Sequence, residues 1–224
     1  MSYERHNIKS ISKDLQKFVI NTPVLRFDII DSLCNCNVFF KCENFQHTGS
    51  FKYRAAINAI KKMPVEFKQT GVITHSSGNF AHALARAAYE LKIPCHIVMP
   101  NNTPNFKKSS VLSYTKNVIE CESNLKAREF TTSEILKNKN LYFIHPSNNM
   151  DVILGNSSCA LEFIIDYPNL DFVFSPIGGG GLIAGTSIAI NNFSEHCQVI
   201  GADPSIVDDA CLLYTSDAAD DSLR

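Results

Sequence analysis

Short apolar stretches alternate along this chain with longer stretches of helical period, and this alternation restricts the fold more than any other feature of the sequence. The Val-, Ile- and Phe-containing run at 171–177, for example, is followed by a helical pattern at 181–192. Strands that alternate with helices pair in parallel, because each helix carries the chain back across the sheet. We therefore predict an α/β protein with mainly parallel sheets. The expected elements are strands at 37–43, 71–75, 94–100, 117–121, 141–145, 171–177 and 197–203, and helices at 52–62, 80–91, 106–115, 125–137, 151–166 and 181–192.

Composition and charge restrict the class of partner. The 224 residues are 45% hydrophobic and 19% charged, which is enough to bury one sizeable core or two small ones. A formal net charge of −1 provides no basic field for nucleic acid or anionic membranes. The polar start of the chain and the lack of an apolar run of about 20 residues indicate neither an export signal nor a membrane span. We expect a cytoplasmic protein that binds a small molecule, with no nucleic-acid or membrane partner.

The eight cysteines are scattered, and no two form a C-x-x-C pair. In a chain without an export signal they are expected to be reduced thiols. The alternative is a zinc site formed by Cys34, Cys36, Cys42 and His47. The C-x-C spacing suits zinc poorly and Cys42 lies in an expected strand, so we expect no zinc there.

Parallel α/β folds place their chemistry in the loops that leave the carboxyl ends of strands. Three such loops stand out: HTGSFK at 47–52, HSSGNFA at 75–81 and PIGGGGLIAG at 176–185. The third contains four consecutive glycines, Gly178, Gly179, Gly180 and Gly181. Backbone N–H groups without Cβ obstruction, next to a helix N-terminus, suit a phosphate group. The loop lacks the G-K-[ST] of a nucleotide P-loop, so a compact phosphate monoester fits better than a dinucleotide, and a tight turn is the alternative.

Lys52 lies in the first turn of an expected helix that begins near Phe51, where Thr48 or Ser50 can provide the cap. The positive end of the helix dipole disfavours an ammonium there, and the neighbouring Arg54 acts in the same direction. The neutral amine is then more available, as a Schiff base requires. Taken alone, a lysine in a first turn is more often a solvated cation.

The three loops together carry a family resemblance. The stretches CENFQHTGSFKYRAA, THSSGNFAHALARAA and SPIGGGGLIAG resemble, in this order, the motifs of fold type II pyridoxal-phosphate enzymes, in particular the serine/threonine dehydratase and serine racemase branch. The resemblance extends over residues 22–209. It implies a tryptophan synthase β-like fold, in which two open parallel-sheet α/β domains enclose the cofactor in the cleft between them.

The resemblance also implies roles for residues around the cofactor. Lys52 would hold pyridoxal 5'-phosphate through its amine and then act as the base that removes the Cα proton. Phe51 would pack near the pyridine ring, and Asn79 would hydrogen-bond the phenolic oxygen, although an Asn in such a loop is otherwise often a turn residue. The phosphate would be bound by the four glycines, Gly178, Gly179, Gly180 and Gly181.

Substrate contacts follow from the same resemblance. Ser76, Ser77 and Gly78 would bind the substrate carboxylate, with a helix N-cap as the alternative for the serines. Ser77 matches the position that faces the lysine across the cofactor in serine racemases, where two opposed bases are required. Ser147 stands where racemases have an Asn near the substrate. Dehydratases can have the same pattern, so the sequence does not separate the two reactions.

Two further positions concern the edges of the site. Asp203, the carbonyl of Val207 and Asp209 match the family's divalent-metal position and would suit Mg²⁺ or Ca²⁺, with a solvated acidic loop as the alternative. Ala55 replaces the usual glycine of the lysine motif, and Phe80 replaces the common His after S-G-N. Both substitutions add bulk that we expect near the cofactor.

The family pattern divides the chain into parts. Residues 1–70 and 149–210 are expected to form a large domain, and 71–148 a small inserted domain. Residues 211–224 lack periodicity and are expected to be a non-native tail, with a solvated natural tail as the alternative. In the family the chain continues further and supplies a serine to the pyridine nitrogen, so we expect a C-terminally truncated sequence that exposes a sheet edge and binds its cofactor weakly.

The function that the resemblance implies is dehydration and deamination of L-serine or L-threonine to a 2-oxo acid and ammonia, with serine racemisation as an additional activity. Full-length members are expected to form homodimers. One alternative is β-replacement, as in cysteine synthesis. The other is a non-catalytic module that binds a phosphate ligand, in which Lys52 makes only an electrostatic contact.

Overall fold

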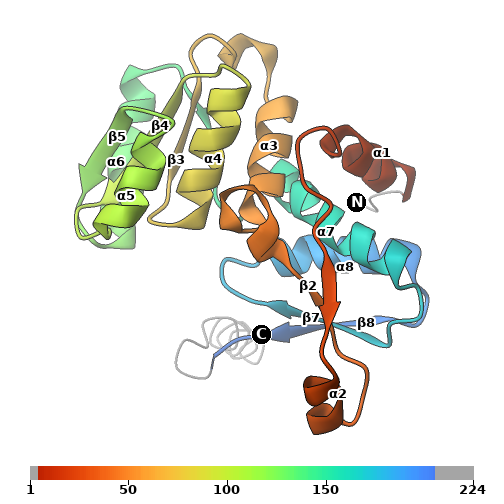
Figure 1. Ribbon diagram of the computed structural model, residues 1–224. Helices are drawn as coiled ribbons and strands as arrows, with labels where there is room; N and C mark the ends of the chain where they lie inside the picture. Colours follow the sequence, from red (N-terminus) through yellow and green to blue (C-terminus); the bar gives the residue numbers. More distant parts are fainter. Residues whose placement is uncertain (1–4, 205–224) are drawn as a thin grey trace, which may run out of the picture.

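The computed structural model describes residues 5–204, and a four-stranded parallel sheet forms the upper part of the molecule in Figure 1. Its strand order is β5-β4-β3-β6, and every pair is parallel, as the alternation of strands and helices predicts. The elements are β3 (Val72–His75), α4 (Asn79–Glu90), β4 (Cys95–Pro100), α5 (Asn105–Leu112), β5 (Asn117–Cys121), α6 (Leu125–Asn138) and β6 (Tyr142–Phe143).

Helices cover both faces of this sheet. Val72 of β3 belongs to the apolar cluster that contains Leu84 of α4, whereas its neighbour Ile73 packs with Val98 of β4 and with Ile135 of α6. Successive strand residues point to opposite faces, so a sheet covered on both sides needs apolar residues at consecutive positions. This explains why β3 and β4 are continuous apolar runs and not alternating ones.

Helix α7 lies at the centre of the other part of the molecule and packs against α3, α8 and α1. The elements there are α1 (Arg5–Leu15), α3 (Lys52–Lys62), α7 (Met150–Asp166), β7 (Phe172–Pro176), α8 (Gly181–Phe193) and β8 (Gln198–Ala202). At the α3–α7 crossing, a Cβ on Gly155 would lie 2.6 Å from the carbonyl oxygen of Arg54, so only glycine allows this approach. Strands β7 and β8 form a separate parallel pair.

The N-terminal segment contains elements that the periodicity does not predict. Helix α1 and the hairpin-like arrangement of β1 (Val24–Arg26), α2 (Asp28–Cys34) and β2 (Phe39–Lys41) precede the first expected helix. Strands β1 and β2 are antiparallel. The expected strand at 37–43 is shorter than predicted, because β1 offers only three partners and a 3₁₀ turn follows at once. The remaining short turns are η1 (Glu43–Phe45), η2 (His47–Gly49) and η3 (Val65–Phe67).

The predicted helices from 52 onward and the parallel strands all occur, with ends that differ by a few residues. Strand β6 is the most reduced, although the N–H of Ile144 still donates to the carbonyl of Ile73 at 2.9 Å. The sheet formed by β3 to β6 falls inside 71–148, while the proposed domain boundaries themselves remain a prediction.

Two features of the surface bear on the expectations from sequence. Within residues 5–204, no helix has the length and apolar character that a membrane crossing requires. Phe172 and Phe174 of β7 are 51% and 66% exposed, so one face of the β7–β8 pair presents aromatic rings. Val207, Asp209 and the expected tail at 211–224 lie outside the described residues.

Candidate active site

Lys52 is the first residue of α3, and its amine is enclosed by protein groups. Its Nζ donates to the carbonyl oxygen of Pro146 at 3.1 Å and lies 5.1 Å from the ring centre of Phe51 and 5.7 Å from that of Phe80. Burial lowers the pKa of the Lys52 amine below its usual value, because a desolvated ammonium is disfavoured. The amine is therefore held in a place that favours its neutral, nucleophilic form.

The cause of this lowered pKa differs from the one that the sequence suggests. Neither Thr48 nor Ser50 caps α3; the N-cap is Phe51, and no side chain closes the helix. Within the described chain, the buried hydroxyls of Thr48 and Ser50 have no hydrogen-bond partner. Arg54 does not act on the amine either. Burial is the cause that the structure supports.

Arg54 is instead the centre of a buried ion cluster. Its guanidinium bonds Glu43 at 2.8 Å and Glu162 of α7 at 2.7 Å, and Lys41 reaches Glu162 at 2.8 Å. Burial by itself would lower the pKa of Arg54, but the hydrogen bonds that its guanidinium donates to both carboxylates outweigh burial and raise the pKa. The side chain thus ties α3 to α7 and η1, which fixes the helix that carries Lys52.

A turn at residues 145–148 connects Lys52 with the glycine loop. The carbonyl of Pro146 accepts the Lys52 amine, and the next residue, Ser147, lies directly under the glycines. A Cβ on Gly179 would be 2.4 Å from Ser147 Oγ, and one on Gly181 would be 3.2 Å from Ser147 Cα. The turn therefore brings the two motifs together, although about 130 residues separate them.

The glycine loop has the form that an anion site needs. Gly180 adopts a left-handed conformation with φ of 77°, and Gly181 begins α8. Open space of at least 4 Å lies where a Cβ on Gly178 would point. The loop joins the end of β7 to the helix N-terminus, where free N–H groups and the helix dipole favour a negative group.

The serine-containing loop leaves the end of β3 and leads into α4. The N–H of Ser76 donates to the carbonyl of Val98, and Ser76 Oγ accepts from the N–H of Gly78 at 3.3 Å. Asn79 is exposed at the first position of α4. The N-cap is Gly78, and neither serine closes the helix, so the alternative role as a cap fails. Since Phe80 reaches the Lys52 amine, the loop lies beside α3.

Ser77 lines a cavity of about 340 Å³. Lys107, Arg128 and Thr103 also line it. Gly78 is near one of these cations, because a Cβ added to it would lie 4.0 Å from Lys107 Nζ. A cavity with two cationic side chains beside this loop suits a carboxylate.

Of the three expected metal ligands, the described residues include only Asp203. Asp203 follows β8 and is half-buried, whereas Val207 and Asp209 are not among the described residues. In residues 5–204, no group of three or more His, Cys, Asp or Glu side chains is arranged to hold a metal ion, which includes the zinc alternative at Cys34, Cys36, Cys42 and His47.

Sequence reasoning placed too little weight on some residues and misjudged others. Ala55 does not face the Lys52 site; it packs against Gly155 of α7, where its Cα would be 2.8 Å from a Cβ on that glycine. Phe80 does lie beside the amine. The carbonyl of Pro146 and the cations Lys107 and Arg128 were missed. No local pattern marks a backbone carbonyl as a contact, since the fold alone brings it to Lys52.

Comparisons with known proteins identify a matching family and similar chains. Residues 15–221 match the family described as "Pyridoxal-phosphate dependent enzyme". The chain is 38% identical over 203 residues to a serine racemase of Dictyostelium discoideum, covering 91% of this chain and 63% of that protein. It is 39% identical over 196 residues to a beta-hydroxyaspartate dehydratase of Paracoccus denitrificans (strain Pd 1222), covering 88% and 62%.

Solved structures give the same result for the fold. The structure of maize serine racemase superposes with a TM-score of 0.92 at 33% identity, over 97% of this chain and 66% of the other. The fold is therefore that of the fold type II pyridoxal-phosphate enzymes. The chain spans less than two thirds of the length of the two curated relatives named above, 63% and 62%.

Proposed function

Because the chain belongs to the family of pyridoxal-phosphate dependent enzymes, we propose that the protein acts on L-serine or L-threonine, from which it releases ammonia and a 2-oxo acid. The observation that carries this proposal is the Lys52 amine, which is half-buried, lowered in pKa and held by the Pro146 carbonyl. The motifs around it are those of the dehydratase and racemase branch.

The described residues fit the cofactor. A phosphate monoester needs a cradle of N–H groups, and the glycine loop offers one with Ser147 packed beneath it and open space beside Gly178. An aldehyde needs a neutral amine, which burial favours at Lys52. Asn79 is exposed beside Phe80 and is free to contact a ring oxygen. When bound, the cofactor supplies an electron sink for the pair of electrons left at Cα.

The residues of this chain then have separate tasks. Ser76, Ser77 and Gly78 hold the substrate carboxylate, with Lys107 and Arg128 close by as cations. The Lys52 amine takes the proton from Cα. Loss of the β-hydroxyl as water and later hydrolysis of the C–N bond give the 2-oxo acid and ammonia, with no net consumption of water.

Racemisation of serine is the second candidate, because Ser77 lies at the family position across from the lysine. The curated relative of Dictyostelium discoideum is named as a serine racemase. In that reaction one residue removes the Cα proton and the other returns a proton to the opposite face, so the β-hydroxyl stays. We further propose that the whole protein is a cytoplasmic homodimer, with 71–148 as the small domain.

Borohydride trapping tests the proposal. The full-length protein is incubated with pyridoxal 5'-phosphate, reduced and digested, and the peptide that contains Lys52 is examined for a pyridoxyl group. We expect the pyridoxyl group on Lys52 and none in the Lys52→Ala variant. Lys61 is a second lysine of α3, so Lys61→Ala is the matched control and should still be labelled on Lys52. Labelling elsewhere, or none in a folded protein, would indicate a phosphate-binding module.

Product analysis then identifies the reaction. Release of pyruvate from L-serine or 2-oxobutyrate from L-threonine supports the lyase, and D-serine supports the racemase. A sulfide-dependent product in place of these would support β-replacement and overturn the proposal.

A further inference from the structure

His145 follows β6 and accepts two backbone hydrogen bonds. Its Nδ1 lies 3.2 Å from the N–H of Ser147 and 2.8 Å from the N–H of Asn148. Both partners are donors, so Nδ1 must carry a lone pair, and the single proton of the neutral ring must be on Nε2. These two bonds close the turn at 145–148.

The same turn holds two parts of the candidate active site. The Pro146 carbonyl accepts the Lys52 amine at 3.1 Å. Ser147 supports the glycine loop, with its Oγ 2.4 Å from the place of a Cβ on Gly179. A change in the turn therefore reaches both the amine and the phosphate cradle.

We infer that His145 is a positioning residue, whose neutral ring fixes the turn that holds the Lys52 amine and the floor of the glycine loop. The functional consequence rests on the proposed function. The structural part, the tautomer and its two hydrogen bonds, does not depend on the substrate or on the reaction.

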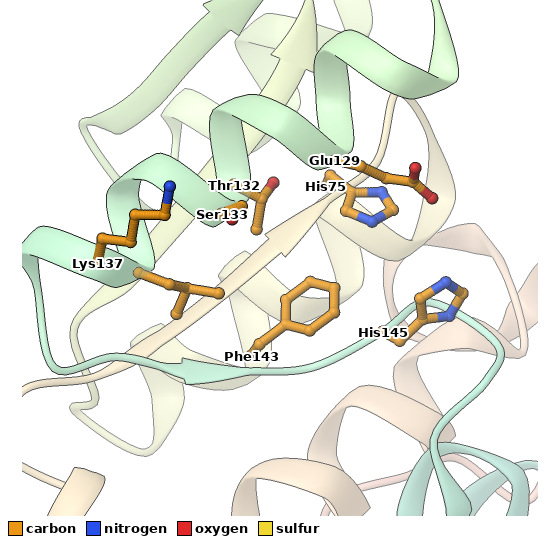
Figure 2. A pocket seen from close by; sticks show the side chains of 8 residues that line it. His75, Glu129, Thr132, Ser133, Lys137, Phe143 and His145 are labelled. Carbon is orange, nitrogen blue, oxygen red and sulfur yellow. The ribbon is translucent and has the colours of Figure 1, made fainter.

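The surroundings of His145 bear on its protonation. The ring lines a cavity of about 440 Å³ together with His75 of β3 and Glu129 and Lys137 of α6 (Figure 2). The rings of His75 and His145 are 5.6 Å apart. Burial lowers the pKa of His145, Glu129 raises it and Lys52 lowers it, and the net direction is downward. The pKa of His75 is lowered as well, mainly by burial and then by His145.

Protonation of Nδ1 would place a third N–H against two N–H donors. The lowered pKa keeps the ring neutral at neutral pH, so the turn is closed there. As the pH falls through the pKa of His145, both hydrogen bonds are lost and the Lys52 amine loses its fixed acceptor. Cofactor affinity and turnover should then fall together on the acid side.

Two substitutions in the full-length protein separate the acceptor from the ring. In His145→Asn the side-chain oxygen can accept the N–H two residues ahead, as in an Asx turn, but it does not titrate. In His145→Leu the volume is similar and the acceptor is absent. We expect His145→Leu to weaken pyridoxal 5'-phosphate binding by about ten-fold at neutral pH, which corresponds to the net loss of two hydrogen bonds, from the part-buried N–H of Ser147 and the exposed N–H of Asn148.

His145→Asn should retain cofactor affinity within about three-fold and lose the acid limb of turnover that the unsubstituted protein shows, since an uncharged amide replaces a titrating ring. His82→Asn serves as the matched control, because His82 of α4 also has a lowered pKa but its ring packs at a tilt against that of Tyr114, with 5.7 Å between the ring centres. That variant should keep the acid limb.

A second measurement is independent of catalysis. Nitrogen NMR of the full-length, cofactor-free protein should show His145 as the Nε2–H tautomer, with Nδ1 unprotonated at neutral pH. The Nδ1–H tautomer, or Asn and Leu variants that bind the cofactor equally well, would overturn the inference. If Lys52 fails to take up the cofactor while the tautomer is as expected, the proposed function fails and the structural part stands.

Discussion

At the scale of single residues, burial and not a neighbouring charge controls the reactivity of Lys52. The Lys52 Nζ lies 5.1 Å from the ring centre of Phe51 and 5.7 Å from that of Phe80, and desolvation lowers the pKa of the amine. Arg54, two residues further, donates the N–H groups of its guanidinium to two carboxylates, those of Glu43 and Glu162. Sequence proximity is therefore a poor guide to which charges a side chain meets.

Replacing Phe80 tests this account. Phe80→His keeps an aromatic ring but admits polar groups and water, so the ammonium is less disfavoured and the pKa of Lys52 should rise. At neutral pH a smaller fraction of the amine is neutral, and reductive methylation of Lys52 should slow several-fold in the cofactor-free protein. The rate of methylation is measured at several pH values by mass spectrometry of the peptide that contains Lys52.

The control for this experiment is Phe106→His, since Phe106 is 69% exposed on α5. It should leave the methylation profile of Lys52 unchanged. An equal profile for Phe80→His and the unsubstituted protein would show that Phe80 does not keep the amine dry.

Gly179 gives a second prediction at this scale. In Gly179→Ala the new methyl group meets Ser147 Oγ at 2.4 Å and Cβ at 2.8 Å, so the loop must move. We expect unfolding free energy to fall by about 1–3 kcal/mol, the usual cost of overpacking. Urea unfolding of the cofactor-free protein measures the change.

Two further variants make the comparison specific. Gly178→Ala has no atom within 4 Å of the new Cβ and should change the unfolding free energy by less than about 0.5 kcal/mol. Adding Ser147→Gly to Gly179→Ala removes the clashing atoms and should recover most of the loss. Without such recovery, the cost would have another origin.

At the scale of elements, several contacts with α7 place α3, among them the Gly155 crossing, the Arg54 ion pair and the hydrogen bond from Asn58 Nδ2 to the carbonyl of Asp151 at 2.8 Å. Gly155 lets the backbones approach, and Arg54 bonds Glu162 across the interface. The buried guanidinium has partners on two sides, Glu43 and Glu162, so it is satisfied where an unpaired charge would be costly.

Arg54→Met tests the importance of this cluster. The methionine fills most of the volume but leaves Glu43 and Glu162 without their shared cation, and breaking a buried pair typically costs about 3–5 kcal/mol. Chemical unfolding gives the value. Lys137→Met, which removes the exposed pair with Glu134, should cost less than about 1 kcal/mol. Equal costs would contradict the role of Arg54 as a tie between helices.

At the scale of the whole molecule, several histidines share one property. Burial is the first cause that lowers their pKa values, and neutral rings are therefore built into both parts of the fold. The histidines are His47, His75, His82, His96 and His145.

This property predicts acid sensitivity. A folded pKa below the unfolded value means that the unfolded chain binds protons first as pH falls, so the stabilisation is complete above about pH 6.5 and is lost below it. The urea concentration at the unfolding midpoint should decrease as the pH is lowered from about 7.5 to about 5.5. Each histidine contributes at most about 1.4 kcal/mol per pH unit to the loss of unfolding free energy, and less where the ring is exposed. The double variant His75→Asn/His145→Asn should flatten this dependence, and an unchanged slope would contradict it.

The parallel strands and the helices from residue 52 onward could be predicted because their apolar periods are local and strong. β5 and α3 occur at the predicted bounds. The N-terminal helices α1 and α2 could not be predicted in this way, because α1 has only a narrow apolar face and α2 has no buried residue. The end of β6 was misplaced: β3 continues to His75, but after Ile144 the chain leaves it for the turn at 145–148, which no local propensity marks.

The sequence by itself determined the order of strands and helices from residue 52 onward, since this depends on local composition and period, and it contained the three motifs whose resemblance to a family pointed to Lys52 and the glycine loop. Only the tertiary structure decided that Pro146 holds the Lys52 amine, that Ser147 lies under the glycine loop and that Arg54 joins α3 to α7. The physical reason is that such contacts join residues far apart in the chain. Backbone carbonyls and buried donors acquire their roles only when the fold removes water from around them.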